Sequence, residues 1–334
     1  MEILIFAAKT FLILFSIIAI ILLIAFLAAK SAQKPELEVE LLHKKFKNLA
    51  LLLKAQTLPK KLFKEELKKQ KKSDKVDDES EDLKKRLFVI DFNGDIKAQA
   101  VSSLREEISS ILMVATPQDE IVVRVESPGG VVHGYGLAAA QLLRIREKGI
   151  PLTVCVDKVA ASGGYMMACV ANKVMAAPFA IIGSIGVVAQ VPNFHRILKK
   201  NDVDYKEYTA GEFKRTVSIF GEITEKGEEK FREQLEDTHV LFKTFVSKYR
   251  PNLKTSEVAT GEYWYGERAL EKGLVDELMT SDDYLLKHLE SHQILKVAFK
   301  QKQKLGEKIS EILSLSLQNA TERIIAQLEN RKLL

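Results

Sequence analysis

The sequence predicts an α/β fold with a mainly parallel sheet, preceded by one transmembrane helix. From Leu87 onward, short apolar runs alternate with stretches that carry apolar residues at helical spacing. This alternation is typical of strand–helix–strand units, in which parallel strands are covered by helices. Residues 11–29 form an uncharged run, and the chain has 334 residues of which 46% are hydrophobic. A chain of this length and composition can bury a sizeable core without disulfides.

The N-terminal run predicts a membrane anchor over residues 1–30. As a helix, an uncharged stretch from residue 11 to residue 29 is long enough to cross a hydrocarbon layer of about 30 Å. A cleaved secretion signal is the alternative, but its apolar core usually has only about 7–15 residues and follows a basic cluster. The segment before the run holds one Glu and one Lys. We therefore expect the helix to be retained.

The charge of the chain is concentrated beside this predicted anchor. Residues 43–72 hold eleven Lys and two Glu, whereas residues 73–82 hold six acidic residues and one Lys. Because these segments contain most of the excess base, the remaining chain is nearly neutral, and we expect no nucleic acid partner. Residues 31–84 are interpreted as a charged linker, helical from His43 to Pro59 and disordered over residues 68–82. This helix is either solvated or lies on the membrane or on a neighbouring chain.

The folded part is predicted to contain five strands and three helices, followed by a helical tail. Val, Ile and Leu dominate the predicted strands, and the helices show apolar residues three and four positions apart. The strands are residues 87–90, 121–125, 152–156, 173–176 and 205–208, and the helices are 101–114, 135–146 and 225–249.

Two glycine pairs mark the candidate site. The sequence SPGG at residues 127–130 directly follows one predicted strand, and ASGGY at residues 161–165 follows another. A turn from a strand into a helix exposes backbone N–H groups at the positive end of the helix dipole, and this arrangement suits an oxyanion. Ser162 lies in the second turn, where its hydroxyl could face outward. An N-cap role for Ser162 is the alternative.

A nucleophilic serine needs a base, and the histidines are poor candidates. His43, His239, His288 and His292 lie in the linker, the long helix and the tail; His133 is placed to line the site, and His195 begins a polar helix. A lysine kept neutral by its surroundings is the remaining option, but composition alone does not select one. Cys155 and Cys169 lie in apolar runs and lack metal-ligand spacing, so they are read as buried hydrophobes.

Four segments together resemble the signal peptide peptidase A family of membrane serine peptidases, and in particular its SohB branch. They are residues 126–136, 157–168, 183–188 and 208–215. The resemblance implies that residues 85–290 form a peptidase domain of the ClpP/crotonase type, a βαβ spiral that assembles into rings. Residues 291–334 are then a helical C-terminal tail.

The resemblance also implies roles for individual residues. Ser162 matches the nucleophile and Lys214 the general base of a Ser-Lys dyad. Gly130 and Gly163 match the donors of the oxyanion hole, and Ser184 matches a hydroxyl that orients the lysine. The charge of Arg215, which follows Lys214, would favour the neutral amine.

The function implied is hydrolysis of short or unfolded peptides through an acyl-enzyme, without metal or cofactor, by a homo-oligomer at a bacterial inner membrane. The resemblance favours a periplasmic catalytic domain, whereas the lysines after the anchor favour the cytoplasm. A catalytically silent membrane scaffold and a crotonase-like acyl-CoA enzyme are the alternatives.

Overall fold

The computed structural model describes residues 11–12, 14–16, 18, 36–79 and 85–300. The chain divides into two units, and the larger, Glu38–Ala298, contains every predicted site residue. In the smaller unit, Met1–Leu37 with Phe299–Leu334, the rings of Phe11 and Phe15 stack. None of the helices in the described ranges is long and apolar enough to cross a membrane. Most of the predicted anchor, and the predicted tail from residue 301, lie outside the described residues.

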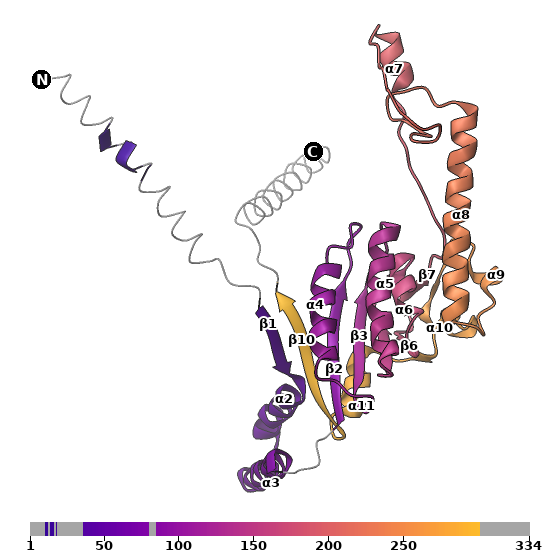
Figure 1. Ribbon diagram of the computed structural model, residues 1–334. Helices are drawn as coiled ribbons and strands as arrows, with labels where there is room; N and C mark the ends of the chain where they lie inside the picture. The colour runs from indigo at the N-terminus through magenta and orange to yellow at the C-terminus, as the bar shows by residue number, and fades with distance from the viewer. Residues whose placement is uncertain (1–10, 13, 17, 19–35, 80–84, 301–334) are drawn as a thin grey trace, which may run out of the picture. The chain divides into compact units, whose positions relative to one another are not determined.

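A seven-stranded sheet forms the centre of the larger unit (Figure 1). Its strand order is β1-β10-β2-β3-β4-β6-β9, and neighbours from β10 to β9 pair in parallel. The bounds are β1 Glu36–Leu41, β10 His292–Lys300, β2 Lys85–Asn93, β3 Glu120–Glu126, β4 Leu152–Val156, β6 Lys173–Ala176 and β9 Glu277–Leu278. The predicted α/β fold and four of the five predicted strands are confirmed.

Helices cover both faces of this sheet, because successive strand residues point to opposite sides. Phe88 and Ile90 of β2 pack with α4 (Val101–Leu112), α5 (Val132–Glu147) and α6 (Gly163–Ala168). Leu87 and Val89 face the other way, towards α2 (Leu42–Thr57) and α11 (Ser281–His288). Burial on both faces explains why these strands are continuously apolar. The remaining helices are α3 Lys60–Glu79, α7 His195–Lys200, α8 Glu225–Tyr249, α9 Thr255–Val258 and α10 Gly266–Glu271.

A second sheet of three short strands carries the candidate site. It consists of β5 (Val159–Ala161), β7 (Ile181–Gly183) and β8 (Tyr263–Tyr265), in that order. Strand β7 is parallel to β5 and antiparallel to β8. Strands of three residues have no detectable period, so the sequence did not predict this sheet.

Three predictions about secondary structure were wrong. Residues 205–208 form no strand, since Tyr205 packs its ring on Phe220 and Glu207 pairs with Arg215 within an irregular segment. Helix α3 continues to Glu79 through a segment expected to be disordered, because its Lys, Glu and Gln residues favour helix despite their polarity. Strand β10 takes up the first part of the predicted helical tail, where Ile294 and Val297 are buried in the core on opposite faces of the sheet.

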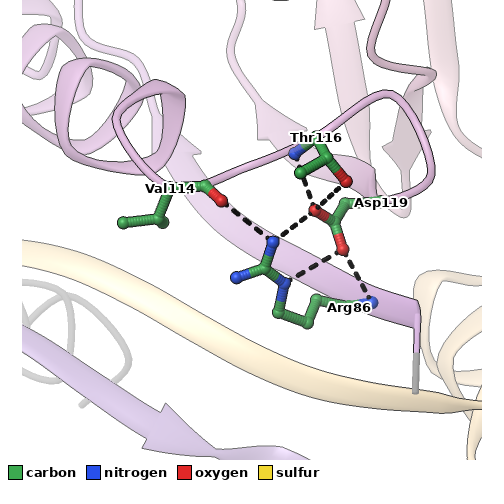
Figure 2. A network of polar contacts seen from close by, with 4 residues as sticks. All are labelled: Arg86, Val114, Thr116 and Asp119. Atoms are coloured by element: carbon green, nitrogen blue, oxygen red, sulfur yellow. Dashed lines mark hydrogen bonds and ion pairs between the residues drawn. The ribbon is translucent and has the colours of Figure 1, made fainter. Parts of the chain in front are cut away.

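A buried carboxylate ties the loop after α4 to the start of β2 (Figure 2). Asp119 accepts hydrogen bonds from the guanidinium and backbone N–H of Arg86 and from the N–H and hydroxyl of Thr116. The same guanidinium donates to the carbonyl of Val114. Burial alone would raise the pKa of Asp119, but these donors outweigh it and lower that pKa to about 2.

Candidate active site

Ser162 occupies a strained turn between β5 and α6. Its backbone has φ 52° and ψ −116°, a conformation that is costly for a residue with a side chain. The Ser162 N–H donates to the carbonyl of Gly183 at 2.7 Å, and the Ser162 carbonyl accepts from the N–H of Met166 at 2.9 Å. The Ser162 hydroxyl caps no N–H of α6. The N-cap alternative is therefore not supported, and the turn resembles a nucleophile elbow.

The two glycines after Ser162 are required by close packing. A Cβ on Gly163 would lie 2.3 Å from the ring of Tyr135, and a Cβ on Gly164 would lie 2.6 Å from the carbonyl oxygen of Ser127. Because neither position has room for a side chain, α6 lies directly against α5 and the loop after β3. The backbone N–H of Gly163 is thereby held beside Ser162.

The SPGG loop lies against this turn. Gly129 has φ +91°, and a Cβ there would lie 2.7 Å from Cβ of Ser162 and 2.8 Å from the backbone nitrogen of Gly163. Gly130, the predicted oxyanion donor, follows directly and passes the Ile96 backbone with no room for a Cβ. The structure thus brings the two glycine pairs together.

Two buried hydroxyl groups hold the SPGG loop in place by hydrogen bonds. The Ser127 hydroxyl accepts from the N–H of Gly129 at 3.1 Å and contacts the Tyr135 hydroxyl at 2.5 Å. The Tyr135 hydroxyl in turn donates to the carbonyl of Asp95 at 2.8 Å. Burial raises the pKa of Tyr135, so this hydroxyl keeps its proton. Neither residue is assigned a role by the sequence pattern, although Ser127 belongs to the motif itself.

Ser184 lies beside the turn of Ser162. It directly follows β7, in which Gly183 pairs with Ala161, the residue before Ser162. Neighbouring strands are about 4.8 Å apart, so the two serines leave adjacent parallel strands at the same end. Ser184 also has a positive φ of 52° and donates its N–H to the carbonyl of Glu262 at 2.7 Å. This proximity fits the orienting role that the resemblance implies.

Lys214 is not brought to Ser162 within one chain. It is exposed in the segment between β7 and α8, and this segment contacts the N-terminal end of α8. There, Glu212 pairs with Lys226, and the ring of Phe213 lies beneath the ammonium groups of Lys226 and Lys230. Figure 1 shows the segment, with α7, running beyond that end of α8.

The length of α8 gives the scale of this separation. His239, near the middle of α8, places a ring nitrogen 3.3 Å from the carbonyl of Ile185, the residue after Ser184. From Lys230 or Lys226 to His239, a rise of 1.5 Å per residue gives about 14 to 20 Å along the helix axis. Proton transfer needs heavy atoms within about 3 Å. Lys214 instead lines a surface pocket of about 550 Å³ with Tyr205, Glu207, Tyr208 and Arg215.

His239 is the residue near the site that sequence analysis set aside. It shares a face of α8 with the buried residues Phe242 and Val246, three and seven positions later, and this spacing was the available signal. His133 is exposed on α5, and His195 begins α7. Cys155 and Cys169 are buried, and burial raises the pKa of both thiols to about 12, so neither is a nucleophile.

Comparison with known proteins identifies the class. The sequence matches the family described as "Peptidase family S49 N-terminal" over residues 1–142 and "Peptidase family S49" over residues 144–295. It is 49% identical over 332 residues to "Probable protease SohB" of Haemophilus influenzae, covering 96% of this chain and 94% of that one. A protein of the same description from Buchnera aphidicola subsp. Schizaphis graminum is 44% identical over 336 residues, covering 98% and 97%.

Among solved structures, a mutant of the 1510-N membrane-bound stomatin-specific protease in complex with a substrate peptide aligns with a TM-score of 0.44 at 15% identity. The alignment covers 69% of this chain and 99% of that one. These sequence relatives place the chain among the proteases. The chain belongs to peptidase family S49, and the predicted family resemblance is confirmed.

Proposed function

We propose that this protein is a membrane-anchored serine endopeptidase that cleaves short or unfolded peptides with Ser162 as nucleophile and Lys214 as general base. The observation that carries the proposal is the strained turn of Ser162, held against the SPGG loop by glycines that leave no space between them. Strain of this kind persists only where the surrounding structure imposes it, and it is concentrated at reactive sites. The domain is proposed to be of the ClpP/crotonase type.

The proposed reaction has two steps. Neutral Lys214 accepts the proton of Ser162 as its Oγ attacks the peptide carbonyl, and the N–H groups of Gly130 and Gly163 stabilise the oxyanion. The C–N bond then breaks, the leaving amine takes the proton from the Lys214 ammonium, and the acyl group stays on Ser162. In the second step water attacks this ester with the same base, which releases the acid and restores the serine. Ser184 orients the lysine amine, and no metal or cofactor takes part.

Lys214 is proposed to act on Ser162 of a neighbouring copy. Within one chain, α8 keeps the two residues apart, whereas the segment that carries Lys214 leads away from its own sheets. This segment exposes large apolar side chains, with Tyr208 89%, Val188 82% and Ile197 58% exposed. Large apolar side chains exposed on one segment favour a protein interface. A homo-oligomeric ring would cover them and complete each site.

The anchor and its side of the membrane are part of the proposal. The uncharged run at residues 11–29 supports a single-pass anchor, and the relatives that are 49% and 44% identical come from bacteria, so we place the protein in the bacterial inner membrane. We assign the catalytic domain to the periplasm. A phosphatase fused to the C-terminus tests this assignment, because it is active only outside the cytoplasm; an inactive phosphatase on a stable fusion would place the domain inside.

The peptidase proposal is tested by cleavage of an unfolded protein with purified variants of the full chain. Ser162→Ala and Lys214→Ala should each abolish cleavage, while Lys206→Ala, which removes an exposed lysine from the same segment, should retain it. Mixing the two inactive variants within one oligomer should restore part of the activity, since each supplies what the other lacks. A fully active Ser162→Ala would instead support a silent scaffold, and turnover of CoA esters would support the acyl-CoA alternative.

A further inference from the structure

Helix α2 carries an apolar stripe that begins in the core and ends in solvent. Leu42 is buried and Phe46 is half-buried, and both pack against the sheet. Leu49 and Leu53 continue the stripe at helical spacing, but they are 50% and 69% exposed, and neighbouring Leu52 is 66% exposed. Three large apolar side chains between residues 49 and 53 therefore face solvent.

Helix α3 does not cover these leucines. The two helices pack together as a hairpin, joined by an ion pair between Lys54 and Glu66 at 2.7 Å (Figure 1). In the part of the hairpin whose side chains are described, the half-buried apolar residues are Phe46, Leu51, Leu58, Phe63 and Leu67, a different set from the exposed leucines. The exposed leucines thus remain available to something outside the folded unit.

The segment that carries the exposed leucines is rich in lysine. Residues 43–72 contain eleven Lys and two Glu, both Glu lie in α3, and Glu66 pairs with Lys54 and Lys69; the other acidic residues of α3 follow from Asp74 onward. We call the exposed Leu49, Leu52 and Leu53, together with the lysines of residues 44–69, the lysine–leucine face. A basic helix with exposed leucines is typical of peptides that lie in the interface of an anionic bilayer.

We propose that the lysine–leucine face binds an anionic lipid surface. Apolar side chains enter the acyl boundary while the ammonium groups meet the lipid phosphates, so one ligand satisfies both features. A second copy of the same hairpin would bring two strongly positive surfaces together and repel. Charge complementarity therefore favours lipid over a second copy of this chain.

Chain length keeps the hairpin near the bilayer. Between the end of the proposed anchor at residue 29 and the start of α2, residues 30–41 span at most about 43 Å when fully extended. This proximity depends on the anchor proposed above, whereas the lipid contact depends only on the lysine–leucine face. The contact would fix the orientation of the catalytic domain on the membrane.

The test places an environment-sensitive NBD fluorophore on Leu52→Cys in the full chain, reconstituted into vesicles. Both native cysteines are fully buried, so the introduced thiol is labelled selectively. Vesicles of phosphatidylcholine alone are compared with vesicles that also contain phosphatidylglycerol. Met113→Cys is the matched control, because Met113 is 86% exposed at the end of α4 and lies outside the hairpin.

We expect the Leu52 probe to shift to shorter wavelength and to resist iodide quenching only with phosphatidylglycerol. High salt, or a Lys60→Glu/Lys61→Glu/Lys64→Glu variant, should remove the shift, and the Met113 probe should not respond. The proposal would be overturned if the emission of the Leu52 probe did not change, or if it shifted equally in both kinds of vesicle. A shift in the absence of lipid would also overturn it and would indicate contact with a second copy of the chain. Flotation with phosphatidylcholine vesicles after a carbonate wash tests the anchor separately.

Discussion

Gly129→Ala is expected to damage catalysis by displacing the Ser162 turn. The new Cβ would lie 2.7 Å from Cβ of Ser162 and 2.8 Å from the nitrogen of Gly163. Ordinary carbon contacts begin at about 3.5 Å, so the SPGG loop and the turn must separate by nearly that difference, of the order of 1 Å. A displacement of about 1 Å in a reacting group can lower the rate about a hundredfold. The expected kcat/KM is therefore about one hundredth of the wild-type value.

Gly149→Ala is the matched control for backbone strain. Gly149 also has a positive φ, +70°, but a Cβ added there would meet nothing within 4 Å. A left-handed conformation costs an Ala about 1–2 kcal/mol, so both variants should lose comparable stability from this source. Only Gly129→Ala should lose activity.

The assay measures cleavage of an unfolded protein, together with thermal unfolding followed by circular dichroism. Unfolding of each variant at a similar temperature would show that the comparison concerns the site rather than the fold. If folded Gly129→Ala cleaved as fast as Gly149→Ala, the link between the SPGG loop and the nucleophile would be refuted.

Three further predictions concern the supporting structure. The native pKa of Asp119 is about 2, below its usual 3.8, so the charged form of Asp119 should add about 2 kcal/mol to the free energy of unfolding above pH ~4, and this contribution should be lost as the pH falls towards 2. Asp119→Asn should flatten this pH dependence of the free energy of unfolding, measured by urea titration. An unchanged pH dependence in the variant would contradict the prediction. Tyr135→Phe removes the hydroxyl that donates to the carbonyl of Asp95, so it should lower the free energy of unfolding by about 1–3 kcal/mol, measured by urea unfolding. It should also lower kcat/KM, measured by cleavage. Wild-type values of both quantities would show that Tyr135 does not support the SPGG loop. Cys155 and Cys169 should react with a thiol reagent only as the protein unfolds, and rapid labelling of the native chain would contradict their burial.

The turn of Ser162 could be predicted from the sequence because its determinants are local. A serine and two glycines follow one another at residues 162–164, after the predicted strand 152–156, and SPGG directly follows β3; the short strand β5 between them was not predicted. The long strands β2, β3, β4 and β6 were equally visible, since burial on both faces makes them continuously apolar.

The arrangement around Lys214 could not be predicted, because it depends on contacts between distant segments. The position of Lys214 follows from the pairing of Glu212 with Lys226, and that of Ser184 from the contact between Ile185 and His239. These two contacts fix different points on α8, and no local pattern shows how far apart they lie. For the same reason, β10 was assigned to a tail although it joins the central sheet beside β2.

The central claim, that Ser162 is the nucleophile, is tested most directly by mapping the acyl-enzyme. The full chain is incubated with an activated peptide ester, quenched in acid, digested and analysed by mass spectrometry. We predict that the acyl group is found on Ser162, that it is absent from Ser162→Ala, and that Lys214→Ala forms it far more slowly. An acyl group on any other residue, or equal acylation of Ser162→Ala, would contradict the account.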